Sequence, residues 1–478
     1  MADEHSPHRR DQAKARVFAR VGQPRFSSAY TSAAEPVAMA LQPSLKAAAV
    51  LPYSPGRLTE RTSESKSVLR KALILVEGDR GNGPLCIQAA ERLGLHPITL
   101  AVDPARYGYV AARSIEAIGV DTANIDALIR ECYGLRRRYD IAGITGLAND
   151  EVLVSATVGK LCRHFGLPGP SPVSIEQCTD KFTQRQLLSE AGVSVPAYQM
   201  AVNRMEAESF ASEIGMPVVV KPALGGGSAR AKLCRNLEDL TAHTANLFGA
   251  KQTARTSQRV LVEDFIQAPQ YNVNVFGNEI IGIAMVELCQ SSSLICREWT
   301  YPAVLTDEEH EEISDVSLHC LHALGLGWGP TNIELRLTKH GPVVIGVRPH
   351  LPASPAPELV QLAYGVDLIT EHIKLVTGAQ RSLRRSPTET AAARFLISDR
   401  DGTFDWMDGD PRVSAVPGVS EVKWYIEPKT RIARKGDCRD CIGHVIAVSP
   451  SHAQTRIILQ RAADSIDWSI TPSHNFGE

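Results

Sequence analysis

The sequence lacks several features that would place it in a class directly. No apolar run reaches the roughly 18 residues needed to span a bilayer, and the first ten residues lack the apolar core of a secretory signal. The net charge is only −2 over 478 residues, so nothing indicates a nucleic-acid or membrane partner. Arg, Ser and Ala recur before residue 70, as in a transit peptide, but acids such as Asp3 and Glu4 argue against one. We expect a cytoplasmic protein.

The ten cysteines form no recognisable disulfide framework, which is typical of reduced thiols in the cytosol. One CxxC pair is present, Cys438 and Cys441. A zinc site would need a second such pair, and a redox pair would open a helix after a strand. We favour a turn with two incidental thiols.

The familiar nucleotide motifs are also missing. The chain has no Walker A sequence and no GxGxxG. Gly78, Gly81 and Gly83 follow the first predicted strand, but their spacing is GxxGxG and no well-placed acid follows the second strand. We interpret them as turn glycines or as part of a substrate-side loop. A dinucleotide-binding enzyme is the hypothesis that we favour least.

What the sequence does contain indicates a globular protein of roughly three domains, with 44% apolar and 22% charged residues. Residues 1–68 are poor in aromatics and rich in Ser, Pro, Ala and Arg, so we expect a disordered extension. Between 69 and 170, buried strands such as 72–76 and 97–102 alternate with helical patterns. That alternation predicts a parallel α/β domain.

A linker rich in Gly and Pro at 166–172 precedes a second region, 171–385. Alternating patterns at 271–276, 332–337 and 342–347 predict an antiparallel sheet there. Residues 386–478 contain mostly strands, with one helix near 453–463, and are expected to close the structure. The predicted fold is therefore α/β and α+β, with no internal repeat.

One glycine-rich stretch has residues that suit the binding of an anion. A β-branched strand ends at Lys221 and is followed by Gly225, Gly226, Gly227 and Ser228. Glycines let backbone N–H groups approach an anion closely, and a lysine ammonium neutralises phosphate charge. The loop alone fits a nucleotide-phosphate site and a plain surface turn equally well.

The order of the segments decides between these alternatives. Thr179-Asp-Lys181 opens a helix, Ala191-Gly-Val-Ser-Val-Pro196 ends it, the Lys221 strand and glycine loop follow, and then come Val262-Glu-Asp-Phe-Ile266 and a hairpin carrying Glu334. This ordered set resembles the ATP-grasp superfamily. Segments at 357–360, 365–368, 417–422 and 443–448 are similar to its L-amino-acid ligase branch, so the resemblance runs from about residue 69 to the last residues.

The resemblance implies an ATP-dependent carboxylate–amine ligase, with ATP and Mg²⁺ (or Mn²⁺) as cofactors and a small-molecule acid and amine as substrates. It leaves a homodimer open. Lys181, Lys221 and the loop Gly225–Ser228 would bind phosphates, and Glu263 would accept a ribose hydroxyl. The backbone of Asp264, Phe265 and Ile266 would meet adenine, Glu334 would hold the metal, and Glu298 would approach the substrate amine. The plainer alternative for each of these side chains is an ordinary structural or surface residue.

The sequence departs from the family pattern at the second strand of the hairpin. A family member typically has Glu-x-Asn-x-Arg there, whereas this chain has Gly346, Arg348 and His350. One negative charge is lost and one positive charge is gained, so we expect Mg²⁺ to bind weakly. Arg348 could contact the triphosphate directly, and both Arg348 and His350 are candidate catalytic residues. The alternative function is thus a catalytically impaired relative that binds nucleotide or a partner in a regulatory or scaffolding role.

Overall fold

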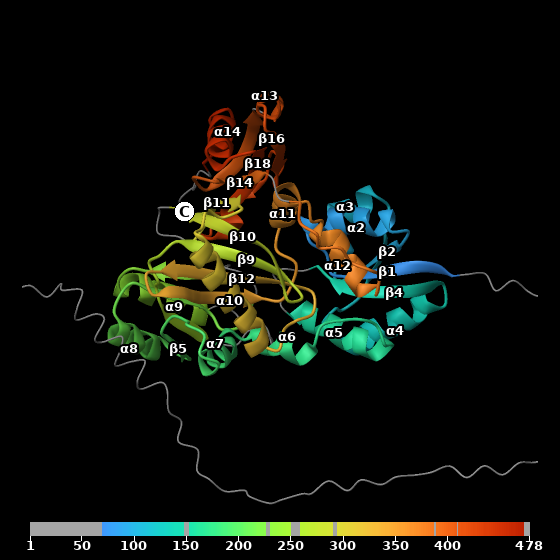
Figure 1. Ribbon diagram of the computed structural model, residues 1–478, viewed down its shortest axis with the longest axis horizontal. Helices are drawn as coiled ribbons and strands as arrows, with labels where there is room; N and C mark the ends of the chain where they lie inside the picture. Colours follow the sequence, from blue (N-terminus) through green and yellow to red (C-terminus); the bar gives the residue numbers. More distant parts are fainter. Residues whose placement is uncertain are drawn as a thin grey trace, which may run out of the picture.

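The computed structural model describes residues 69–147, 153–225, 230–249, 259–289, 294–386, 389–408 and 410–472. The predicted extension 1–68 lies outside these residues. Within them, a parallel sheet comes first and antiparallel sheets follow (Figure 1), which confirms the predicted fold class. No helix in the described part of the chain is long and apolar enough to cross a membrane.

The N-terminal sheet has four parallel strands in the order β3-β2-β1-β4. Its central strand is fully buried from Ala72 to Val76, as expected for a parallel strand covered on both faces. The strands are β1 (Arg70–Val76), β2 (His96–Ala101), β3 (Glu116–Gly119) and β4 (Tyr139–Gly146). The helices are α2 (Asn82–Arg92), α3 (Gly108–Ala112), α4 (Ile125–Arg136) and α5 (Leu153–Phe165), with a 3-10 turn η1 (Pro104–Arg106).

The glycines after β1 serve close packing. A Cβ on Gly78 would collide with the ring of Tyr107, and one on Gly83 would collide with Tyr109. Tyrosine rings therefore occupy the space beside this loop, which favours the interpretation of these residues as turn glycines.

A smaller antiparallel sheet has the order β5-β8-β6-β7. Helix α6 was not predicted, although Ser171 caps its start and Pro172 occupies its first turn, two standard start signals. The strands are β5 (Tyr198–Ala201), β6 (Val218–Pro222), β7 (Lys232–Cys234) and β8 (Val260–Asp264). The helices are α6 (Pro172–Thr179), α7 (Lys181–Glu190), α8 (Arg204–Ile214) and α9 (Leu237–Gly249).

The largest sheet has eight strands in the order β13-β12-β9-β10-β11-β14-β18-β16. Strands of the predicted closing region join it directly, because β11 pairs with β14 antiparallel, with Glu298 opposite Arg394. The predicted domain boundary at residue 385 thus separates strands that belong to one continuous sheet, and the domain division stays a prediction. The strands are β9 (Gln270–Phe276), β10 (Glu279–Leu288), β11 (Cys296–Tyr301), β12 (Pro330–Thr338), β13 (Gly341–Arg348), β14 (Thr390–Ile397), β16 (Val419–Trp424) and β18 (Cys441–Ser449).

The remaining elements of the C-terminal region form a fourth sheet, of three strands, and its neighbours. The sheet has the order β17-β15-β19, and α14 packs against β18 and β14. The elements are β15 (Gly402–Asp408), α13 (Asp410–Ser414), β17 (Arg431–Ile432), the 3-10 turn η2 (Cys438–Asp440), α14 (His452–Asp464) and β19 (Asp467–Thr471).

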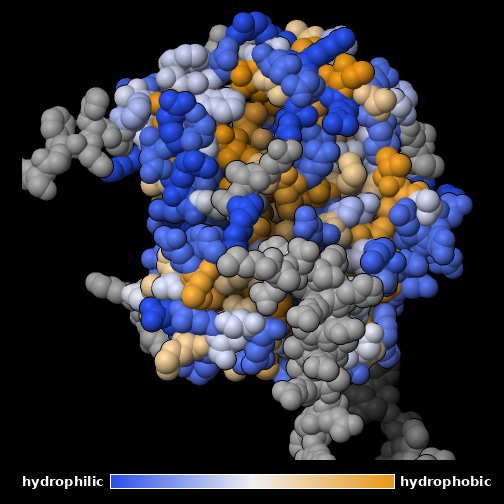
Figure 2. Space-filling model, turned by 90° about the vertical axis from the view of Figure 1, so that its left-hand side faces the viewer, coloured by the Kyte–Doolittle hydropathy of each residue, from blue (hydrophilic) through white to orange (hydrophobic). Residues whose placement is uncertain are grey.

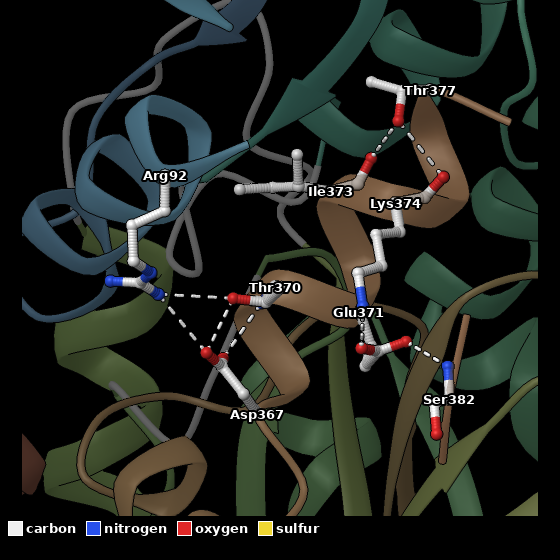
Figure 3. A network of polar contacts seen from close by, with 8 residues as sticks. All are labelled: Arg92, Asp367, Thr370, Glu371, Ile373, Lys374, Thr377 and Ser382. Carbon is white, nitrogen blue, oxygen red and sulfur yellow. Dashed lines mark hydrogen bonds and ion pairs between the residues drawn. The ribbon is translucent and has the colours of Figure 1, made fainter. Parts of the chain in front are cut away.

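Helix α10 (Asp307–Ala323) follows β11, and helices α11 (Ala356–Tyr364) and α12 (Leu368–Val376) follow β13 in turn. Helix α12 crosses to the N-terminal domain and packs against α2 (Figure 1). Arg92 of α2 donates to Asp367 and to Thr370, each at 3.3 Å, and Asp367 also caps α12 (Figure 3). This contact ties the N-terminal domain to the body of the protein.

Candidate nucleotide-binding cleft

An open cleft of about 1050 Å³, solvent at its mouth included, lies between the small antiparallel sheet and the β9–β12–β13 part of the large one. Viewed from the side of α8 and β5, the molecule has a hollow near the middle of this face, with apolar residues within it (Figure 2). The cleft brings together ten of the predicted site residues: Lys181, Lys221, Gly225, Glu263, Asp264, Phe265, Ile266, Glu334, Arg348 and His350. Gly226, Gly227 and Ser228 lie outside the described residues.

A buried ionic triad forms one wall of the cleft. Glu263 at the end of β8 accepts from Arg185 Nε at 2.6 Å and pairs with Lys221 Nζ at 2.5 Å. Register explains the second contact, because Val219 lies opposite Glu263 and Lys221 follows two residues later on the same face. Burial would raise the pKa of Glu263, but the two cations outweigh it and hold that pKa below its ordinary value. Both carboxylate oxygens are therefore engaged within the protein.

Lys181 lies at the first turn of α7, which Asp180 caps by accepting from the N–H groups of Phe182 and Thr183. Its ammonium donates to the carbonyl oxygen of Gly225 at 2.7 Å, a neutral acceptor. Burial, followed by the charges of Lys221 and Arg348, lowers the pKa of Lys181 to about 7. An anion in the cleft would favour the charged form of this lysine.

Gly225 is exposed and has a positive φ of 118°. L side chains rarely adopt that conformation, so glycine suits the position where the loop leaves its strand. The loop begins directly beside the Lys181 ammonium.

The predicted adenine-binding segment is partly occupied by contacts within the protein. The N–H of Asp264 donates to Ala197 O at 2.9 Å, and the N–H of Phe265 donates to Pro217 O at 3.4 Å. The guanidinium of Arg336 lies over the ring of Phe265, 4.9 Å from the ring centroid. These contacts fix the segment as a rigid part of the cleft.

The hairpin β12–β13 carries an ion pair at the expected metal position. Glu334 lies opposite Gly346, and Arg348 is two residues further on. The guanidinium of Arg348 pairs with both carboxylate oxygens of Glu334, with Nη1–Oε1 at 2.7 Å and Nη2–Oε2 at 3.0 Å. A Cβ on Gly346 would stand 3.2 Å from Glu334 Oε2. The glycine thus leaves room for this bidentate pair, which is among the strong geometries of charged hydrogen bonds.

His350 and Glu298, the two remaining predicted site residues, lie in different surroundings. His350 lines the cleft, and its Nδ1 donates to Leu351 O at 2.7 Å. Glu298 does not line the cleft: it is buried in β11 and accepts from Arg394 Nε and Nη2 at 3.1 and 2.9 Å. Its approach to a substrate amine stays a prediction.

Sequence reasoning missed three residues of the site. Gln184 and Arg185 follow Lys181 by three and four positions in α7, so all three share one helix face. The Gln184 side chain donates to Val347 O at 2.8 Å and accepts from Val347 N at 3.1 Å, which fixes α7 against β13. Arg336 follows Glu334 by two positions and shares its face of β12. These spacings are the signals that could have found them.

The cleft carries an excess of positive charge. Among the described residues that line it, five cationic side chains face three carboxylates: Lys181, Arg185, Lys221, Arg336 and Arg348 against Glu263, Asp264 and Glu334. When Lys181 is protonated the excess is two positive charges, and such an excess in a partly closed site attracts anions.

Comparisons with known proteins show the family and the fold. Two family models match the chain: "Carbamoyl-phosphate synthase L chain, ATP binding domain" over residues 180–384 and "L-amino acid ligase C-terminal domain 2" over residues 394–471. The chain belongs to the ATP-grasp superfamily. It is 53% identical to the protein y4rH of Sinorhizobium fredii over 404 residues, which cover 84% of each chain.

Among solved structures, an L-amino acid ligase from Bacillus licheniformis superimposes with a TM-score of 0.71 at 18% identity, covering 85% of this chain and all of that one. The biotin carboxylase domain of a 2-oxoglutarate carboxylase from Hydrogenobacter thermophilus, solved with MgADP, gives a TM-score of 0.63 at 18% identity, covering 84% of this chain and 91% of that one. These likenesses show the fold.

Proposed function

We propose that this protein binds ATP in the cleft and acts as an ATP-dependent carboxylate–amine ligase on a small-molecule acid and amine. The observation that carries the proposal is the convergence of Lys181, Lys221 and the Glu334–Arg348 hairpin on one cationic cleft. Homologous ATP-grasp proteins are ATP-dependent ligases, which supports ATP as the anion.

The proposed reaction has two steps. A carboxylate oxygen of the acid attacks the γ-phosphorus of ATP, the bond to the β-phosphate oxygen breaks, and ADP leaves. The amine then attacks the acyl carbon of the acyl-phosphate, phosphate leaves, and the amine loses a proton. The role of Lys181 and Lys221 is to neutralise and orient the phosphates, since phosphoryl transfer depends mainly on positioning and electrostatics.

The test is a phosphate-release assay with a panel of amino-acid pairs, run beside calorimetric titration with ATP. The proposal expects ATP binding, and phosphate release only when acid and amine are both present. Lys221→Ala should weaken ATP binding by at least about tenfold, since it removes a charged contact of about 1.4 kcal/mol or more. Clear ATP binding without turnover on a broad panel would count against the ligase.

One observation favours a second function, that of a nucleotide-binding protein without turnover. Mg²⁺ prefers several carboxylate oxygens and water, whereas Glu334 is already paired with Arg348 and Gly346 has no side-chain carboxylate. The residues present therefore do not fit the metal that the family implies.

The combined substitution Gly346→Glu, Arg348→Asn and His350→Arg rebuilds the family pattern and separates the two functions. If the second function is correct, the triple variant should gain ATPase or ligase activity over the unmodified chain. Fast turnover by the unmodified chain would exclude it.

A further inference from the structure

The hairpin β12–β13 contains a cation held where a metal ion would be expected. Arg348 is fixed by two hydrogen bonds to Glu334, so its position is set by the fold and not by a ligand. Its side chain is 28% exposed, and it lines the cleft. Part of the guanidinium is thus available to a ligand in the cleft.

The same hairpin disfavours a divalent ion. Both oxygens of Glu334 are engaged, and a Mg²⁺ bound to either would stand beside a guanidinium of the same sign. An acidic residue at position 346 would be the simplest step toward a metal site, but its Cβ would lie 3.2 Å from Glu334 Oε2.

The other cations of the cleft stand on different elements. Lys221 projects from β6 and Lys181 from the start of α7, while Arg348 projects from β13. Each of the three lines the same cleft. A polyphosphate between them would be contacted by charge from three elements, and Arg presents the fork geometry that suits phosphate oxygens.

We propose that Arg348 replaces the metal ion, so that the cleft binds a nucleoside triphosphate as its metal-free anion. The inference rests on the proposed ATP-binding function and specifies the form of the nucleotide. Magnesium should weaken this binding, because it occupies phosphate oxygens and leaves the nucleotide with less negative charge for the three cations to attract.

The test is calorimetric titration of the full chain with ATP in excess EDTA and again in excess MgCl₂. The inference predicts that ATP binds in EDTA and binds more weakly, or no better, with magnesium. Binding that requires magnesium would overturn the inference while leaving the ATP proposal intact. Absence of binding in both buffers would overturn the ATP proposal itself.

Variants test the role of Arg348 directly. Arg348→Asn should lower the affinity in EDTA by about tenfold or more, and it should make binding depend on magnesium because Glu334 is released. Arg348→Lys keeps the charge without the fork, and it should retain an intermediate affinity. Arg92→Asn removes a more exposed arginine–carboxylate pair whose residues do not line the cleft, and it should change neither value. Equal affinity of Arg348→Asn and the unmodified chain in EDTA would refute the assignment.

A second readout does not depend on turnover or on heats of binding. Electron paramagnetic resonance of Mn²⁺, added to the unmodified chain with ATP, should show no protein-bound ion beyond the Mn²⁺–ATP complex itself. Melting curves of each variant establish that it is folded before the comparison. A protein-bound Mn²⁺ signal that Glu334→Gln abolishes would overturn the inference.

Discussion

If the cleft binds ATP as proposed, Lys181 should make that binding depend on pH, and the direction of the effect follows from its pKa. Its pKa is lowered to about 7 by burial and by the nearby charges of Lys221 and Arg348. Only the protonated ammonium attracts phosphate. Binding should therefore be strongest below pH 7 and weaken as the pH rises through this value. The phosphate itself loses its last proton near pH 6, so its charge is nearly constant above pH 7.

The size of the effect follows from the fraction of Lys181 that carries a proton. That fraction is about one half at pH 7 and about 1% at pH 9, for a pKa of about 7. If the bound nucleotide keeps the lysine protonated, the affinity should fall about 50-fold between these pH values, which equals about 2.3 kcal/mol.

The assay is calorimetric titration with ATP at pH 7, 8 and 9 in buffers of equal ionic strength. Lys181→Arg is the matched control, because a guanidinium stays charged throughout this range. The variant should bind with nearly the same affinity at all three values. A change of less than about twofold in the unmodified chain would refute the reasoning. The same loss in Lys181→Arg would show that another group is responsible.

Three further predictions concern stability and are measured by thermal unfolding. Glu263→Gln leaves two buried cations without their counter-ion and should destabilise its region by about 3–5 kcal/mol, whereas the exposed pair partner Glu91→Gln should cost less than about 1 kcal/mol. Gly282→Ala places a methyl group against the ring of Tyr364 and should lower stability by about 1–3 kcal/mol. Gly134→Ala, exposed in α4 with open space beside it, should instead stabilise by about 0.5–1 kcal/mol. Melting points that do not separate these variants in this order would contradict the packing described above.

The candidate residues of the cleft were predicted from short local patterns together with the order of those patterns along the chain. Lys221 ends a β-branched strand before glycines, and Glu334 lies on an alternating strand beside a turn. Arg348 stood out because it replaces an amide that the family pattern requires. Each pattern is short, and it is their order from Thr179 to Arg348 that carries the resemblance.

The rest depends on contacts between distant segments. Nothing near Arg185 in the sequence shows that it is buried, since arginines in amphipathic helices are mostly exposed. Its burial comes from Glu263, 78 positions away, and from Ile345 O, 160 positions away. The pairing of β11 with β14 is equally remote, with Glu298 and Arg394 separated by 96 positions. Propensity and periodicity carry no information about such pairs.

The continuous eight-stranded sheet has a consequence for anyone who wishes to isolate the nucleotide-binding portion. The two matched family models meet between residues 384 and 394, a natural place to cut the gene. A fragment ending there would lose β14, and the backbone groups of β11 that pair with it would become an exposed edge. Such edges recruit strands from other molecules. We expect the truncated piece to aggregate, so experiments on the cleft require the C-terminal strands to be kept.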